Sequence, residues 1–269
     1  MTKQGIIRVG IGGWTYEPWR GTFFPEKWPQ ARELDYAASK LTAIEINGTY
    51  YGSQKPATFA KWAQAVPDGF VFSLKASRFC TNRKILAEGG ASVAKFLTQG
   101  IVELGDKLGP ILWQFMATKR FDEADFGAFL SLLPAKQDGL ALRHVVDVRH
   151  ESFRDPAFVA LCRKAGVSIV HTDSPDYPAF GDASGPVSYA RLMRTREAEP
   201  TGYAAAEIDR WADVARGWSK GEASDAFPLA APDTAVTATP RDVFLFYISG
   251  AKVRAPQAAM ATIARLDAI

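Results

Sequence analysis

Cysteine and histidine are scarce in this chain of 269 residues, which contains two cysteines and three histidines. Cys80 and Cys162 lie far apart in the sequence, and neither has a second thiol nearby with which to form a zinc pair. The sequence therefore predicts no disulfide framework and no cysteine-rich zinc site. We expect both thiols to stay reduced in a cytosolic compartment.

Long apolar runs and blocks of one charge are also missing. No window approaches the roughly 18 apolar residues that a membrane-spanning helix needs, and the first residues lack the apolar core of a signal peptide. The formal charge of +3 is spread along the chain without a block of five or six like charges. We therefore expect a cytoplasmic protein without a membrane partner, for which nucleic acid is an unlikely partner. The oligomeric state is not readable.

The composition is that of a soluble globular protein, with 47% apolar and 23% charged residues. The length exceeds that of an ordinary domain but suits an α/β barrel, which folds as a single domain. We therefore expect one domain over residues 1–269.

Eight segments have the apolar character of strands that are covered on both faces, as in a parallel sheet. They are Ile6–Ile11, Ala43–Ile46, Phe70–Lys75, Pro110–Phe115, His144–Arg149, Val167–Thr172, Ser188–Met193 and Val243–Ile248. Most of the segments between them have helical periodicity. Alternating strands and helices predict βαβ units with right-handed crossovers, and eight such units can close into a (β/α)8 barrel of the TIM type.

Three connecting segments deserve separate expectations. The apolar residues from Val93 to Leu104 form one stripe, which predicts a helix of three turns. The Pro-, Gly- and Asp-rich segment Asp173–Pro186 replaces the helix after the sixth strand with an irregular segment. The Ala-, Pro- and Thr-rich segment Gly217–Arg241 predicts a long loop before the eighth strand, either a surface insertion or a loop that hides a short helix.

Polar side chains end most of these strands, and in such barrels the carboxyl ends of the strands form the active site. In the stretch Ala43–Tyr51, Glu45 and Asn47 share one strand face while Ile44 and Ile46 share the other. The complete set of polar residues at strand ends is Glu45, Asn47, Lys75, Gln114, Asp147, Arg149, Asp173 and Arg191. Three acids face three bases, a balance that allows burial without stranding a charge. The alternative is a salt-bridge network that only plugs the barrel.

Aromatic residues and one histidine add to this predicted site. Trp14 and Tyr16 follow the first strand, and Tyr50 follows the second. Aromatic faces beside polar groups suit sugar rings or bases, although these rings can equally pack as a small hydrophobic cluster. Of the histidines, only His150 lies near the predicted rim. No metal site or cofactor is therefore predicted, with a single carboxylate-bound divalent cation left open.

Several separated motifs resemble, in order and spacing, those of the YecE-like family (domain of unknown function 72). They are IGGWTYEPWRGTFFP, AIEINGTYY, FVFSLKASR, KLGPILWQF, VVDVRHESF and SYARLM. The resemblance covers nearly the whole chain and implies a TIM-barrel fold without an established reaction. Its motifs fall on the rim residues named above. The chain departs from the family pattern at Asn82, Met193 and Ser249, which makes it a divergent member.

Three hypotheses for function follow. The first is an enzyme acting on a small polar, anionic molecule that is phosphorylated or carboxylated and resembles a sugar or nucleotide. Arg149 and Arg191 would hold the anion. The acid–base candidates are Glu45, Lys75, Asp147, His150 and Asp173. Hydrolase, isomerase and lyase chemistry all stay open. The second hypothesis is a non-catalytic binding barrel, and the third is a nucleic-acid-processing protein.

Overall fold

The computed structural model describes residues 4–234 and 238–268 of the chain. Eight parallel strands form a closed barrel in the order β1-β10-β9-β8-β7-β4-β3-β2. The strands are β1 (Ile7–Gly12), β2 (Ala43–Ile46), β3 (Val71–Lys75), β4 (Leu108–Gln114), β7 (His144–Asp147), β8 (Ser168–Asp173), β9 (Val187–Leu192) and β10 (Asp242–Tyr247). The predicted (β/α)8 barrel is therefore confirmed, and each strand lies within about two residues of its predicted position, the usual scatter of assigned boundaries.

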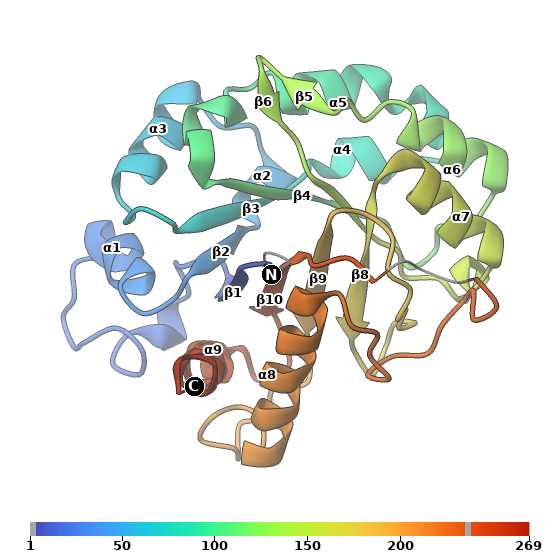
Figure 1. Cartoon of the computed structure of the whole chain (residues 1–269). Helices are drawn as coiled ribbons and strands as arrows, with labels where there is room; N and C mark the ends of the chain where they lie inside the picture. The colour runs from blue at the N-terminus through green and yellow to red at the C-terminus, as the bar shows by residue number, and fades with distance from the viewer. Residues whose placement is uncertain (1–3, 235–237, 269) are drawn as a thin grey trace.

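Helices surround the ring of strands, as Figure 1 shows, and supply the second layer of the fold. They are α1 (Glu33–Ala38), α2 (Gly48–Tyr51), α3 (Pro56–Gln64), α4 (Arg78–Thr81), α5 (Gly90–Leu97), α6 (Glu123–Leu130), α7 (Pro156–Ala165), α8 (Ala205–Lys220) and α9 (Ala255–Asp267). Their apolar faces pack on the outside of the barrel and form the larger of two hydrophobic clusters. No helix of the described residues is long and apolar enough to cross a membrane.

The helix predicted from Val93 to Leu104 is wrong in its length. Helix α5 ends at Leu97, and the chain continues as the 3-10 helix Ile101–Lys107. Gly100 lies between them with φ of 105°, a conformation that glycine adopts at little cost. The apolar stripe runs through this break because both pieces bury their apolar residues: Val93, Phe96 and Leu97 in α5, and Ile101 and Leu104 in the 3-10 helix.

Both predicted irregular segments are present. No helix is described between the end of β8 and the start of β9, where the segment from Ser174 to Pro186 crosses the barrel surface. Helix α8 takes up the start of the predicted long loop and ends at Lys220. From there to β10 the described residues form neither helix nor strand, while residues 235–237 lie outside the described part. A two-stranded hairpin, β5 (Lys136–Gln137) with β6 (Leu140–Ala141), was not predicted.

The alternation of each strand divides its side chains between the barrel interior and the helical layer. The middle of the interior is filled by apolar side chains, including Val71, Leu112 and Phe246. Charged side chains lie above this layer, at the end where the parallel strands finish. We call this end the mouth of the barrel. The apolar layer below closes the barrel, so any ligand must enter from the mouth.

Candidate functional site

Arg191 on β9 is the centre of the charged layer at the mouth, and only 2% of its surface is exposed. Its Nε and Nη2 atoms donate to the two carboxylate oxygens of Glu45, each at 3.0 Å. Its Nη1 atom donates to Asp147 Oδ2 at 2.7 Å. Glu45 and Asp147 are themselves 0% exposed. One guanidinium thus binds carboxylates from two strands, in the paired geometry that a buried charge requires.

Arg149 extends this network toward the solvent. Its Nη2 atom donates to Asp147 Oδ2 at 3.1 Å and to Gln114 Oε1 at 2.8 Å. Gln114 Oε1 also accepts from Arg191 Nη1 at 3.0 Å, so the amide joins the two arginines. The Arg149 guanidinium lies 4.3 Å above the ring of Tyr177, and its buried Nε has no hydrogen-bond partner in the described part of the chain.

Tyr189 supports the network from below and was not predicted. Its hydroxyl donates to Glu45 Oε2 at 2.7 Å and lies 2.8 Å from Ser73 Oγ. Burial, reinforced by the Glu45 charge, raises the pKa of Tyr189 well above its usual value, so the hydroxyl remains a donor. Burial alone would raise the pKa of Asp147, but Arg149 and Arg191 outweigh it and lower that pKa. Both carboxylates are therefore fixed by strong donors.

Lys75, at the end of β3, differs from its charged neighbours because its ammonium has no hydrogen bond or ion pair in the described structure. Its Nζ atom lies 4.2 Å above the ring of Tyr50, and only 7% of its surface is exposed. Burial, followed by the charge of Arg191, lowers the pKa of Lys75 to about 8. An amine with such a pKa can gain and lose a proton near neutral pH.

A cavity of about 760 Å³ opens above these side chains, and we call it the mouth cavity. The residues that line it include Asn47, Tyr50, Lys75, Gln114, Arg149, Tyr177, Arg191, Met193, Ser249 and Lys252. Glu45 and Asp147 do not line it, since the arginines cover them. Four cationic side chains thus face this space, opposed in its lining by Asp176, an exposed acid at the rim. The mouth is therefore positive rather than balanced.

Two of the predicted site residues lie apart from this network. The strand alternation directs Asp173 to the outside, where Arg194 donates to Oδ1 at 2.7 Å and Tyr203 to Oδ2 at 2.9 Å. His150 precedes a 3-10 helix, and its Nδ1 accepts from the backbone N–H of Ser152 at 3.1 Å. Neither residue lines the mouth cavity. The predicted balance of three acids and three bases depended on Asp173, so that expectation was wrong.

The aromatic residues predicted for the site lie on two sides of the mouth. Tyr50 lines the mouth cavity, and its hydroxyl accepts from Asn82 Nδ2 at 3.1 Å. Trp14 and Tyr16 instead line a neighbouring cavity of about 360 Å³, which Asn47 joins to the first. All of the predicted aromatic residues therefore border a cavity at the mouth.

Residues that sequence reasoning missed belong to the loops, apart from Tyr189. Lys252 begins the short 3-10 helix Lys252–Arg254 after β10, and Tyr177 lies in the irregular segment after β8. Tyr189 precedes Arg191 by two residues on the same strand, so its inward direction was readable from the alternation. Met193 and Ser249, two of the positions predicted to depart from the family pattern, line the mouth cavity, and Asn82, the third, donates a hydrogen bond to Tyr50 in its wall.

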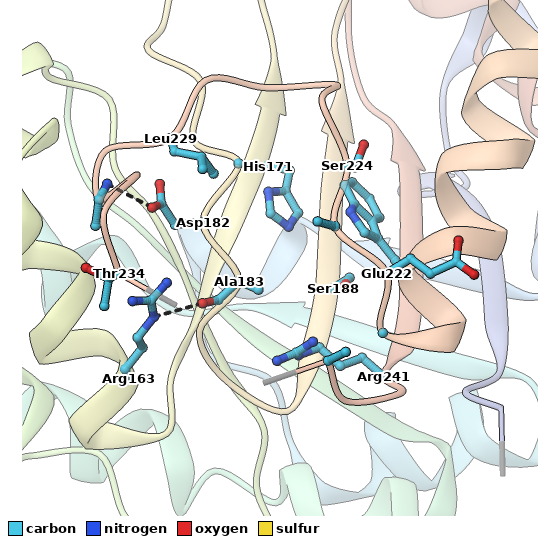
Figure 2. A pocket seen from close by; sticks show the side chains of 16 residues that line it. Arg163, His171, Asp182, Ala183, Ser188, Glu222, Ser224, Leu229, Thr234 and Arg241 are labelled. Carbon is cyan, nitrogen blue, oxygen red and sulfur yellow. Dashed lines mark hydrogen bonds between the residues drawn. The ribbon is translucent and has the colours of Figure 1, made fainter. Parts of the chain in front are cut away.

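A separate cavity of about 300 Å³ lies outside the barrel, beside β8, β9 and α8 (Figure 2). Arg163 and Arg241 border it, each donating from Nε to a loop carbonyl at 3.1 Å. His171 stacks on Trp218 with ring centres 4.5 Å apart, and burial lowers the pKa of His171 to about 4. This histidine is a neutral packing residue, and its side chain points away from the mouth.

Metal-ligand side chains do not gather anywhere in residues 4–234 and 238–268: no three His, Cys, Asp or Glu side chains are placed to hold an ion together. Cys80 and Cys162 are buried free thiols, and burial raises the pKa of Cys80 to about 12.

Comparison with solved structures shows the same fold. A DUF72 family protein from Thermotoga maritima is 20% identical, with a TM-score of 0.71 over 97% of this chain and 99% of that one. One from Enterococcus faecalis is 18% identical, with a TM-score of 0.68 over 98% and 96%. SacUVDE is 6% identical, with a TM-score of 0.54 over both full chains. No curated protein matches significantly.

These likenesses show the barrel, and the family follows from the sequence itself. A family model described as "Protein of unknown function DUF72" matches residues 8–268, which is nearly the whole chain. The match agrees with the resemblance seen in the motifs at the strand ends, and the chain belongs to the DUF72 family.

Proposed function

We propose that the mouth cavity is the active site of an enzyme that binds a small anionic molecule and exchanges a proton with it through Lys75. The observation that carries the proposal is the state of Lys75: buried, without a hydrogen bond, with a pKa lowered to about 8, and lining a cavity. A purely structural lysine would be expected to have a partner for its charge. Perturbed groups of this kind concentrate at functional sites.

The anionic class of the ligand follows from the charges that face the cavity. Lys75, Arg149, Arg191 and Lys252 line it, while Glu45 and Asp147 are covered. Arg149 has donor atoms that no described residue occupies, including its buried Nε. A phosphate or carboxylate would satisfy these donors and would offset the mutual repulsion of the cations.

The acid–base role falls to Lys75 rather than to the carboxylates. Both oxygens of Glu45 already accept from Arg191, and Tyr189 adds a third donor. Asp147 is bound by two arginines, and its lowered pKa makes it a weak base. We assign these carboxylates the task of holding Arg191 and Arg149 in place. At pH 7 about one tenth of an amine with a pKa near 8 is neutral, enough to act as acid or base.

A thermal-shift screen tests the binding part of the proposal. Inorganic phosphate, glycerol phosphate, sugar phosphates and dicarboxylates are the probes, because a ligand that binds the native state stabilises it by about 2.7 kcal/mol at a concentration 100-fold above its Kd. We expect one phosphorylated or carboxylated class to raise the melting temperature of the wild type, and Arg149→Met to reduce the shift. If no anion stabilises the protein, the proposal fails.

The catalytic part is tested with the compound that binds best. We expect NMR spectra to show conversion of this compound by the wild type, and no conversion by Lys75→Met even at concentrations that saturate the variant. A compound that binds and stays unchanged with the wild type would instead support a non-catalytic binding barrel.

The state of Lys75 can be checked without a ligand. The rate at which an amine reacts with an acylating reagent follows its neutral fraction. We expect labelling of Lys75, quantified by mass spectrometry, to rise with a midpoint near pH 8, whereas a free lysine amine in a model peptide titrates at roughly 10.4.

A further inference from the structure

The neighbouring cavity bordered by Trp14 and Tyr16 adjoins the mouth cavity, and we call it the side cavity. The two share Gly12, Asn47, Tyr51 and Lys252 in their linings. The side cavity has a volume of about 360 Å³, compared with about 760 Å³ for the mouth cavity. A single ligand can therefore extend from one into the other.

The side cavity is lined by more aromatic and fewer charged side chains than the mouth cavity, since Lys252 is the one charged residue among the described residues that line it. Trp14, Tyr16, Tyr51 and Trp62 line it. The Trp14 ring stands at 83° to the Trp62 ring with centres 5.4 Å apart, and this edge contact fixes its orientation. Aromatic walls with a few polar groups are typical of pockets that bind rings.

Polar groups at the edges of these rings are open to a ligand. Neither indole N–H of Trp14 and Trp62 donates a hydrogen bond in the described part of the chain, and the Tyr16 hydroxyl also has no partner there. The side chain of Gln54 lines the same cavity. These groups can recognise the substituents of a ring that lies against the aromatic faces.

Two glycines help to keep the passage between the cavities open. A Cβ at Gly12 would lie 3.1 Å from Asn47 Nδ2 and 3.3 Å from Ile248 Cδ1, closer than ordinary contacts. Gly13 has φ of 74°, which turns the chain away from the end of β1 and leads it to Trp14. The loop after β1 can therefore form the side wall without entering the mouth.

Lys252 stands at the junction of the two cavities. Its Nζ lies 4.8 Å from the centre of the Tyr16 ring and 5.4 Å from that of Trp19. Its backbone carbonyl accepts from Trp19 Nε1 at 3.0 Å, which fixes the loop after β10 against the loop after β1. The ammonium has no carboxylate partner in the described structure. An anionic group near Lys252 would thus lie between the cationic cavity and the aromatic one.

From this arrangement we infer that the ligand is a ring-bearing anion: its anionic group contacts Lys75, Arg149 and Lys252, and its ring enters the side cavity against Trp14 and Tyr51. This inference rests on the proposed function of the mouth cavity and narrows its substrate class. It separates ring-bearing compounds from short acyclic phosphates and carboxylates, which would leave the side cavity unused.

Calorimetric titration with four probes tests the inference. The probes are glycerol phosphate, which has no ring, glucose 6-phosphate with a saturated ring, phenyl phosphate with a minimal aromatic ring, and uridine monophosphate with a base joined to a sugar. We expect at least one ring-bearing phosphate to bind ten or more times as tightly as glycerol phosphate. The preferred ring shows whether the side cavity takes a saturated or an aromatic group.

Two variants locate the effect. Tyr51→Ala removes a ring that is 67% exposed, so its cost in stability is small. We expect it to weaken the ring-bearing phosphate by roughly three- to tenfold, the usual value of an aromatic contact. Glycerol phosphate should weaken less, because Tyr51 borders the mouth cavity only at its junction with the side cavity, so the preference for the ring falls. The matched control is Phe79→Ala, which removes a ring that is 60% exposed on the same face of the barrel but lines neither cavity. We expect it to change neither affinity.

The outcomes separate this inference from the proposed function. Equal affinities for all four phosphates would overturn the ring inference while leaving an anion site in place. A preference for rings that survives Tyr51→Ala, or that is lost equally in Phe79→Ala, would also overturn it. Failure of all four phosphates to bind would overturn the inference, and failure of inorganic phosphate and the dicarboxylates as well would remove the proposed function.

Discussion

Both ends of the barrel contain arginines that are paired with carboxylates, but Arg191 at the mouth is buried whereas Arg8 and Arg143 at the other end are partly exposed. At the end opposite the mouth, Arg8 and Arg143 share one carboxylate, Asp242, at 3.6 and 3.3 Å. Each of the two guanidinium groups lies 5.6 Å from the centre of the Phe244 ring. Burial lowers the pKa of both arginines. The side chains at this end fill the barrel, but their hydrogen-bonding groups are only partly paired, since Arg8 Nε and Nη1 have no hydrogen-bond partner in the described structure.

At the mouth, Arg191 is paired through all of its guanidinium nitrogens, while Lys75 and Lys252 have no carboxylate partner in the described structure. Arg191 holds Glu45 and Asp147 with three hydrogen bonds of at most 3.0 Å. Lys75 then lies beside a neutralised network and faces open space. A salt-bridge plug explains the first part but not the second. The comparison teaches that a buried charge indicates function when its partners are absent and a cavity is present.

Removing Arg191, the central arginine of the mouth, should cause the largest loss of stability and so distinguishes the two ends of the barrel most clearly. Arg191→Met leaves Glu45 and Asp147 buried with fewer donors, and breaking such a pair costs about 3–5 kcal/mol of unfolding free energy. Arg8→Met is the matched control at the other end, where Arg143 still contacts Asp242. We expect a smaller loss for the control in urea titrations. Equal losses would mean that the mouth network is no better matched than the opposite end.

Replacing Lys75 should raise the unfolding free energy, in contrast to replacing Arg191. Lys75→Met removes a desolvated charge that has no partner, so we expect the unfolding free energy at pH 7 to rise by up to about 3 kcal/mol, since one pKa unit corresponds to about 1.4 kcal/mol. Glu45→Gln, which replaces the carboxylate bound to Arg191 by a neutral amide, should lower the unfolding free energy. A loss of several kcal/mol in Lys75→Met would make Lys75 a structural member of the network.

The same lysine predicts a pH dependence. Its pKa is lowered to about 8 in the folded state, whereas the unfolded chain titrates near 10.4. Between these values the unfolded state binds more protons, so the stability of the wild type rises with pH. We expect the advantage of Lys75→Met over the wild type to be constant below pH 8 and to vanish by about pH 10.5. An advantage independent of pH in urea titrations would show that burial does not shift this amine.

The smallest effect should come from the ring beneath the ammonium. Tyr50 lies 4.2 Å from Lys75 Nζ, and such a contact stabilises the cation by about 0.5–2 kcal/mol. Tyr50→Leu should therefore lower the pKa of Lys75 by roughly a further 0.4–1.5 units, since one unit corresponds to about 1.4 kcal/mol, and the pH midpoint of acylation measures this change. Tyr50→Phe keeps the ring and should leave the midpoint unchanged, although it loses the hydrogen bond from Asn82. Identical midpoints in both variants would exclude the cation–π contribution.

Much of the site was predictable because strands impose a simple rule. Parallel strands end at one edge and their side chains alternate, so Glu45, Lys75, Asp147 and Arg191 could be assigned to one mouth from the sequence. The same rule, applied to β8, directs Thr172 inward and Asp173 outward. The prediction of Asp173 failed because it treated the residue after the strand as part of the site without following the alternation. His150 lies away from the mouth cavity for a different reason: it follows the end of the strand, and its ring caps the next turn by accepting from the backbone N–H of Ser152.

The sequence by itself determined the barrel, its eight strands and the charged layer at its mouth, because these depend on periodicities of two and 3.6 residues that apolar side chains reveal. Only the tertiary structure decided which charges are paired and which are left open. Lys252 and Tyr177 reach the mouth from loops whose direction is set by contacts with distant segments, as when Trp19 binds the carbonyl of Lys252. Charge pairing depends on distances of a few ångströms between strands far apart in the chain, and these distances exist only once the barrel has closed.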